Sequence, residues 1–236
     1  MDVKYSNEEI KERLFLSIVN RSKVGTDEYL ADTPYEVKGE FALVPRFCVG
    51  DFLNENPLIE GSAKFTLDMA VEAGITADEA ISLAKKNSLK LFPGRLEEVS
   101  GGFEDETELF DGILAPQIFS LGNNNNPWSS SVIFYQPELI ENLAKLQEQD
   151  ILVFPLFDNA VYAMPVSGTA QHQELEEAVR EGAKEISETL QLTVLSSNAL
   201  LYDRINQVYR QTDGLNFAVS EGVNLPAENV TKHFSR

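Results

Sequence analysis

The sequence offers little material for thiol, imidazole or metal chemistry. It contains one cysteine, Cys48, and two histidines, His172 and His233. A single cysteine cannot form an internal disulfide, which favours a reducing compartment. Cys48 lies in an apolar run, where we expect it to pack in the core, and His172 stands between two glutamines, as solvated histidines often do. Because the sequence has no cluster of cysteines and histidines, we predict no metal site.

Long hydrophobic runs are also missing. None approaches the ~20 apolar residues that a membrane-spanning helix needs. Residues 1–15 are charged and lack the apolar centre of a signal peptide. The sequence therefore predicts a cytoplasmic protein that does not bind membranes.

Basic residues are scarce. Lysine and arginine number 19 against 38 aspartates and glutamates, which gives a formal net charge of −19. Small domains usually carry a net charge with a magnitude of roughly 2–8. A surface this acidic repels phosphate backbones, which disfavours direct binding of nucleic acid. Two interpretations remain open: the charge keeps the protein soluble, or an acidic face docks on a basic partner protein.

Familiar catalytic motifs are absent from the sequence. It has no phosphate-binding loop with its lysine, no Gly-x-Gly-x-x-Gly and no His-Glu-x-x-His. The serines at 129–131 have no histidine nearby in the sequence, so they are weak candidates for a nucleophile. The acids are too numerous for a catalytic carboxylate pair to be picked out. We therefore expect no cofactor, and the balance is against an enzyme, although the question stays open.

Local patterns predict the elements of the first hundred residues. Thr76 and Glu79 have the spacing of a capping box, which marks the start of a helix. The expected elements are helices over 7–20, 62–74 and 75–87 and a strand around 41–44, with a strand over 63–69 as the alternative to the second helix.

The second half has a more regular pattern. Asp158-Asn159 fits a two-residue hairpin turn, and Pro137 suits the first turn of a helix. The expected elements are strands over 112–121, 130–136, 150–157, 160–167 and 200–202, helices over 137–147 and 173–190, and a hairpin over 207–220. The order strand, strand, helix, strand, strand, helix, strand predicts an α+β fold. We expect a mixed or mainly antiparallel sheet with helices packed on one face.

We expect residues 96–111 to be the boundary between two parts of the chain. This stretch carries acids, no base and a pair of glycines, so we expect a surface loop. Before it lies an N-terminal helical and mixed segment, 1–100, and after it an α+β segment, 112–220. The two form either separate units or one continuous domain, and 221–236 is expected to be a tail.

Acidic residues gather in two places that could meet a basic partner. The predicted helix over 173–190 carries glutamates on its outer face: Glu174, Glu177, Glu181, Glu185 and Glu188. The acidic loop supplies the interaction candidates Glu104, Asp105, Glu106 and Glu108. The loop lacks the spacing of a calcium-binding EF-hand.

A further candidate is rich in asparagine and has the only tryptophan. Its residues are Asn123, Asn124, Asn125, Asn126 and Trp128. Asparagine tolerates left-handed backbone and hydrogen-bonds to nearby main chain, so a turn between strands is one interpretation. The other is a polar rim with an aromatic platform that holds a peptide or a sugar.

Four segments resemble an uncharacterised bacterial family whose members occur in gut Firmicutes, often among genes of mobile elements. The segments are 20–49, 74–99, 118–166 and 195–204, and the resemblance covers roughly 15–204. Members tend to have Val-Pro-His where this chain reads Thr33-Pro34-Tyr35, so a role of that histidine would not carry over. The resemblance implies a fold and a host range, and no activity.

Three functions follow as hypotheses. The first is a non-catalytic protein that binds a protein partner, as a mobile-element accessory that occupies a basic nucleic-acid-handling surface. The second is an enzyme of unfamiliar type, with a small-molecule site near the asparagine-rich stretch. The third is a homo-oligomeric structural module, such as a homodimer that pairs sheet edges.

Overall fold

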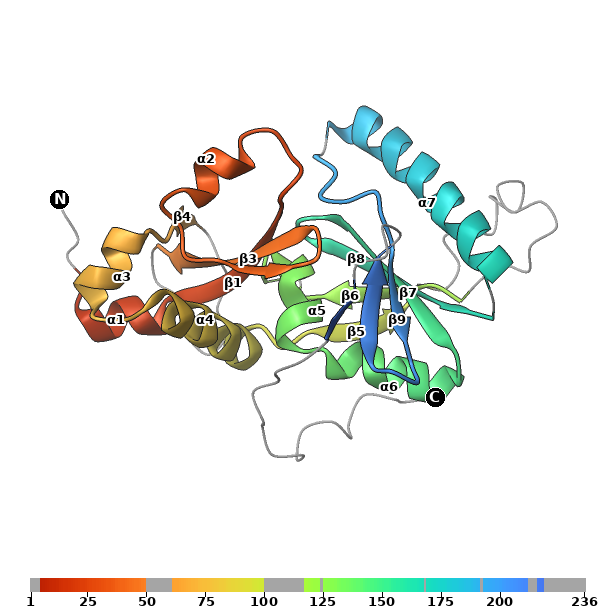
Figure 1. The fold of residues 1–236 in the computed structure, drawn as a ribbon, viewed down its shortest axis with the longest axis horizontal. Coiled ribbons are helices and arrows are strands. Elements are labelled where there is room, and N and C mark those ends of the chain that lie inside the picture. Colours follow the sequence, from red (N-terminus) through yellow and green to blue (C-terminus); the bar gives the residue numbers. More distant parts are fainter. Residues whose placement is uncertain are drawn as a thin grey trace.

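The computed structural model of the protein describes residues 5–49, 61–99, 117–123, 125–167, 169–191, 193–211 and 216–218. These residues form two antiparallel sheets with helices packed against them (Figure 1). The predicted α+β fold is therefore confirmed. A single cluster of buried residues contains both Leu43 of the first sheet and Val153 of the second, so the two sheets share a core.

The first sheet has β3 (Phe41–Cys48) at its centre. Its neighbours are β1 (Leu14–Asn20) on one side and β2 (Glu36–Lys38) and β4 (Ser62–Lys64) on the other. Side chains of β3 alternate between two faces. Leu43 packs with α4 (Ala77–Leu91), and Val44 packs with Leu30 of α2 (Thr26–Leu30). The short helices α1 (Asn7–Glu12) and α3 (Leu67–Ala73) lie beside α4.

The second sheet draws its strands from both halves of the chain. Its order is β11 (Asn216–Ala218), β10 (Val208–Gln211), β9 (Leu200–Asp203), β7 (Asp150–Phe157), β8 (Ala160–Val166), β6 (Phe119–Gly122) and β5 (Arg95–Glu98). The expected hairpins β7–β8 and β10–β11 are both antiparallel pairs, as predicted.

Helices cover both faces of the second sheet, whereas we expected them on one. Ile151 and Val153 face the cluster that contains α6 (Glu138–Gln147), while Leu152 and Phe154 face α7 (Thr169–Leu190). Figure 1 shows α6 below the sheet and α7 above it. Successive side chains of a strand point to opposite faces, and here both sets are apolar, so each face needs its own cover.

The predicted helix over 7–20 is wrong in its second part. Helix α1 ends at Glu12, and β1 begins at Leu14. Leu14, Leu16 and Ile18 enter the main core, while Phe15 packs on the opposite side with Cys48. A strand that is covered on both faces reads as one continuous apolar run, which periodicity cannot distinguish from a buried helix.

The predicted strand over 130–136 is also wrong. Its residues form a 3₁₀ turn, η1 (Ser129–Ser131), followed by α5 (Val132–Tyr135). All four residues of α5 are buried, so their apolar run carries no periodic signal. For residues 62–74 we expected either a helix or a strand, and each is confirmed in part. The segment begins as strand β4, and helix α3 follows with Thr66 as its N-cap.

The helix starts at 75–77 and 137–138 are confirmed. Thr76 Oγ1 accepts a hydrogen bond from the Glu79 N–H at 3.2 Å, and the Thr76 N–H donates to the Glu79 carboxylate at 2.7 Å. This is the predicted capping box at the start of α4. Helix α6 begins directly after Pro137.

The outer edge of β1 is buried, and side chains satisfy its backbone. The Leu16 N–H donates to Ser88 Oγ on α4 at 2.8 Å, and the Leu16 carbonyl accepts from Ser131 Oγ at 2.8 Å. Asn87 Nδ2 donates to the Leu14 carbonyl at 2.9 Å. Buried backbone groups without partners are costly, so these side chains allow a sheet edge to lie inside the protein.

Glu40, in the turn between β2 and β3, joins the two sheets. Its carboxylate accepts hydrogen bonds from Asn20 Nδ2 at 2.9 Å, Ser196 Oγ at 2.7 Å and Asn198 Nδ2 at 3.3 Å. Its N–H donates to Gln211 Oε1 at 3.0 Å. One residue of the first sheet therefore holds the segment before β9 and a side chain of β10.

Candidate functional site

Part of the predicted interaction surface falls outside the described residues. This holds for the acidic-loop candidates Glu104, Asp105, Glu106 and Glu108, for Asn124, and for His233. The described candidates are Asn123, Asn125, Asn126 and Trp128, together with surfaces that the sequence did not single out.

The asparagine-rich stretch hydrogen-bonds largely to its own backbone. Asn123 Oδ1 accepts from the Asn125 N–H at 2.9 Å, and Asn126 Oδ1 accepts from the Trp128 N–H at 2.9 Å. Asn123 Nδ2 donates to the carbonyl of Pro93 at 2.9 Å. Asn126 is only 1% exposed. These contacts are those of a structured turn, and they bring Asn123, Asn125 and Asn126 together with Trp128.

Trp128 is partly buried and packs against the first sheet. Its ring centroid lies 5.5 Å from that of Phe15, and the guanidinium of Arg46 lies 4.6 Å from the Trp128 ring. Arg46 Nε also donates to Ser62 Oγ at 2.9 Å. Trp128 thus already makes a cation–π contact with an arginine of its own chain.

The hydroxyl groups of the three serines of η1 hydrogen-bond to backbone carbonyls of other segments. Ser129 Oγ donates to the Asn159 carbonyl at 3.1 Å, Ser130 Oγ to the Phe157 carbonyl and Ser131 Oγ to the Leu16 carbonyl. All three residues are buried. Nearby, burial raises the pKa of Tyr135, whose hydroxyl donates to the Phe92 carbonyl at 2.8 Å. Hydroxyl groups committed in this way are poorly placed to attack a substrate.

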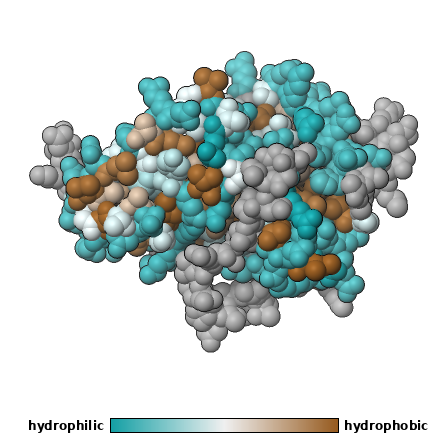
Figure 2. Space-filling model, in the orientation of Figure 1, coloured by the Kyte–Doolittle hydropathy of each residue, from teal (hydrophilic) through white to brown (hydrophobic). Residues whose placement is uncertain are grey.

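Helix α7 presents a continuous line of carboxylates. Its apolar side, with Leu175 and Ala183, packs on the second sheet. Its exposed glutamates are Glu174, Glu177, Glu181, Glu185 and Glu188, which we call the acidic stripe. Steps of three and four residues keep them on one side of the helix over roughly 21 Å. Figure 2 shows mainly hydrophilic residues over the region of α7.

The acidic stripe is free to meet an external cation. Among the ion pairs of the described residues, none involves one of its glutamates. The sequence pattern predicted this outer face, because helical spacing places the five glutamates together.

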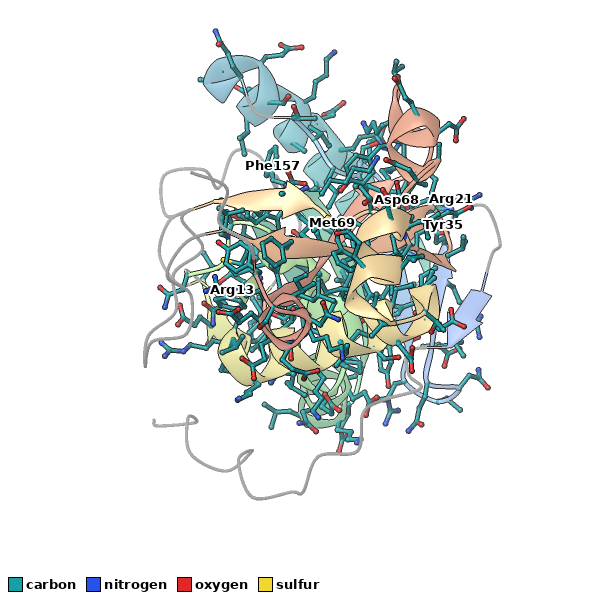
Figure 3. The ribbon with its side chains drawn as sticks, turned by 90° about the vertical axis from the view of Figure 1, so that its left-hand side faces the viewer. Arg13, Arg21, Tyr35, Asp68, Met69 and Phe157 are labelled. Carbon is teal, nitrogen blue, oxygen red and sulfur yellow. The ribbon has the colours of Figure 1, made fainter. Side chains whose placement is uncertain are left out.

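A groove of about 410 Å³ lies between α2 and the starts of α3 and α4. Its lining is mixed and includes Arg21, Asp27, Leu30, Pro34, Tyr35 and Leu67. We call it the α2–α3 groove. Figure 3 shows Arg21, Tyr35 and Asp68 on this side of the molecule. Sequence reasoning missed the groove, because its walls come from segments that only the folded chain brings together.

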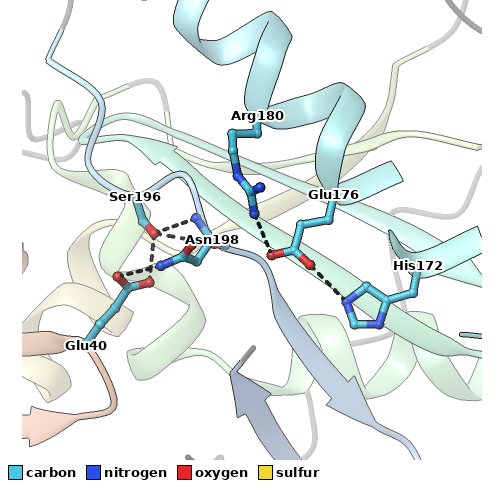
Figure 4. A network of polar contacts seen from close by, with 6 residues as sticks. All are labelled: Glu40, His172, Glu176, Arg180, Ser196 and Asn198. Atoms are coloured by element: carbon cyan, nitrogen blue, oxygen red, sulfur yellow. Dashed lines mark hydrogen bonds and ion pairs between the residues drawn. The ribbon is translucent and has the colours of Figure 1, made fainter. Parts of the chain in front are cut away.

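His172 belongs to a chain of polar contacts along α7 (Figure 4). His172 Nε2 lies 3.5 Å from Glu176 Oε2, and Arg180 Nη2 lies 3.3 Å from Glu176 Oε1. Strand β8 begins next to Asn159, whose carbonyl is bonded to the serine turn, and it ends just before α7 begins. The length of the strand therefore separates the serine turn from the start of α7 by roughly 20 Å. The structure therefore does not bring His172 to Trp128.

The described part of the chain contains no group of three or more histidines, cysteines and acids that could hold a metal ion. Among its helices, none combines the length and the apolar character needed to cross a lipid bilayer. Among the described residues, the acidic stripe and the α2–α3 groove are the surface features taken further as candidates.

Fold and surface together define an acidic α+β protein with two sheets around a shared core. The chain belongs to a family of unknown function, DUF5688, whose profile matches residues 1–204. No curated protein and no solved structure matches the chain.

Proposed function

We propose that this is a non-catalytic cytoplasmic protein that binds a basic surface of a partner protein through the acidic stripe of α7. The observation that carries the proposal is the line of five exposed glutamates on one side of a helix anchored to the second sheet. A net charge of −19 adds a long-range field that speeds encounters with basic partners.

The spacing of the acidic stripe suits a surface that normally handles nucleic acid. Successive carboxylates are roughly 5 Å apart along the helix axis, against 3.4 Å per phosphate along one DNA strand. The stripe thus resembles a DNA strand in having a line of negative charges, but with fewer charges per unit length. The resemblance to proteins of gut Firmicutes supports a setting on a mobile element, where such a protein would occupy a host protein that binds nucleic acid.

Neutralising the acidic stripe should weaken partner binding by about 10–100-fold at low salt. The variant is Glu177→Gln, Glu181→Gln, Glu185→Gln and Glu188→Gln, and the partner is first captured from a host lysate on the immobilised protein. Glutamine keeps the size of the side chain, so the loss measures charge. The dissociation constant of the purified partner is measured at low and at high salt, and the salt dependence should flatten in the variant.

A matched control removes the same number of charges elsewhere. It is Glu12→Gln, Glu97→Gln, Glu138→Gln and Glu148→Gln, all exposed and outside the stripe. We expect its affinity to stay within about threefold of the native protein, because screening limits distant charges. Equal losses in both variants would show that only net charge matters, and the stripe would then not be the binding surface.

The other functions have less support. A small-molecule site at the asparagine-rich stretch would need amides that a ligand can reach, whereas both amide atoms of Asn123 are bonded to backbone groups and Asn126 is only 1% exposed. A homodimer remains an alternative that sedimentation equilibrium of the purified protein addresses directly.

A further inference from the structure

We propose that the α2–α3 groove receives a basic side chain, arginine or lysine, of the partner protein. This inference rests on the proposed function, because it names the chemistry of a second contact to the same basic partner. The acidic stripe would attract the basic partner over a long range, and the groove would bind one arginine or lysine side chain of that partner.

The lining of the groove suits a side chain with an apolar stem and a charged end. Leu30 is 8% exposed and Pro34 is buried, and both contribute apolar atoms to the lining of the groove. Tyr35 and Leu67 are 45% and 42% exposed, which leaves their side chains open to an incoming group. The methylenes of arginine or lysine pack on such surfaces, and the cationic end favours the face of a tyrosine ring.

The lining itself carries one acid, Asp27, and one base, Arg21, so an excess of negative charge comes only from residues next to the lining and from the net charge of −19. Asp27 lines it, and Asp68 and Asp78 directly follow its lining residues Leu67 and Ala77. All three aspartates are exposed. Arg21 is the basic residue of the lining, and its guanidinium can only donate hydrogen bonds. It therefore suits a backbone carbonyl of the partner segment that carries the inserted side chain.

Filling the groove tests the inference. Ala31 lines the groove and is exposed, so Ala31→Trp should occupy the space without disturbing the core. The probe is a short fluorescent peptide of alternating arginine and glycine, with binding followed by anisotropy. We expect Ala31→Trp to weaken binding about tenfold. The control Ile205→Trp, at a residue 81% exposed in the β9–β10 turn, should bind like the native protein.

The same peptide with citrulline in place of arginine separates charge from shape. Citrulline keeps the stem and loses the charge, so we expect it to bind far more weakly. With the arginine peptide, Asp27→Asn should cost about threefold. A lysine peptide shows whether the groove prefers a planar guanidinium or an ammonium.

The outcomes separate this inference from the proposed function. If Ala31→Trp and Ile205→Trp bind the arginine peptide equally well, or if the native protein does not bind it, the groove does not read a basic side chain. The glutamine variant of the acidic stripe is assayed in parallel on the captured partner. A loss there, with no effect of Ala31→Trp, leaves the proposed function standing and overturns the groove alone.

Discussion

Replacing Glu40 by alanine should lower the free energy of unfolding by about 3 kcal/mol. The carboxylate accepts hydrogen bonds from Ser196 and Asn198 (Figure 4). It also accepts one from Asn20, and Ser196 is 1% exposed. Removal of the carboxylate leaves buried Asn20 Nδ2 without this acceptor and leaves Ser196 Oγ with only the Asn198 carbonyl at 3.4 Å. A buried polar group without a partner costs more than the bond itself contributed. Urea denaturation measures the change in the free energy of unfolding. The slope of that free energy against urea concentration should stay the same in the variant, which checks that the surface exposed on unfolding has not changed.

Glu40→Gln is the informative control. The amide keeps one oxygen that can accept a hydrogen bond, so we expect it to retain roughly half of the stability lost in Glu40→Ala. The three donors are all neutral side chains. If glutamine were fully as damaging as alanine, the negative charge and not the acceptor geometry would be what holds the two sheets together.

The combined change Ser88→Ala and Ser131→Ala should also cost about 3 kcal/mol. The two hydroxyls bond the N–H and the carbonyl of Leu16 on the buried edge of β1, and both serines are 0% exposed. Alanine leaves these backbone groups without partners in a dry environment. Thermal and urea unfolding of the double variant measure the loss.

The matched control for the edge is Ser82→Ala. Ser82 lies on the same helix, α4, but is exposed, so its replacement should change stability by no more than about 0.5 kcal/mol. Each single variant, Ser88→Ala and Ser131→Ala, should account for part of the effect. A double variant as stable as the native protein would mean that water reaches the edge of β1 and replaces both hydroxyls.

Elements with local signals were predictable from the sequence. Thr76 and Glu79 form the capping box because the required atoms lie within one turn of a helix. The β7–β8 hairpin follows from the turn residues Asp158 and Asn159 between two apolar runs. The acidic stripe follows from spacing along a single helix.

Two segments that are covered on every side were predicted wrongly. Residues 14–20 and 132–135 are apolar runs whose neighbours come from distant parts of the chain. The contact between Leu16 and Ser131 joins residues that are far apart in sequence. Their conformation depends on which surfaces meet them, and no local pattern contains that information.

The α2–α3 groove escaped prediction for the same reason. Arg21, Tyr35 and Leu67 have nothing in common as sequence positions, and only the docking of α2 beside α3 and α4 brings them together. Single charged and aromatic residues of this kind are common on any surface. Only a shared cavity distinguishes them as candidate site residues.

The position of β5 has a consequence for how the protein can be taken apart. This strand precedes residue 100, yet it forms the last strand of the second sheet by pairing with β6. A cut between residues 99 and 117 would leave β5 on the first fragment and its partner on the second. The two pieces should therefore reassociate by completing a common sheet, as split reporter proteins do, and the interface between them would be a row of backbone hydrogen bonds backed by a shared core.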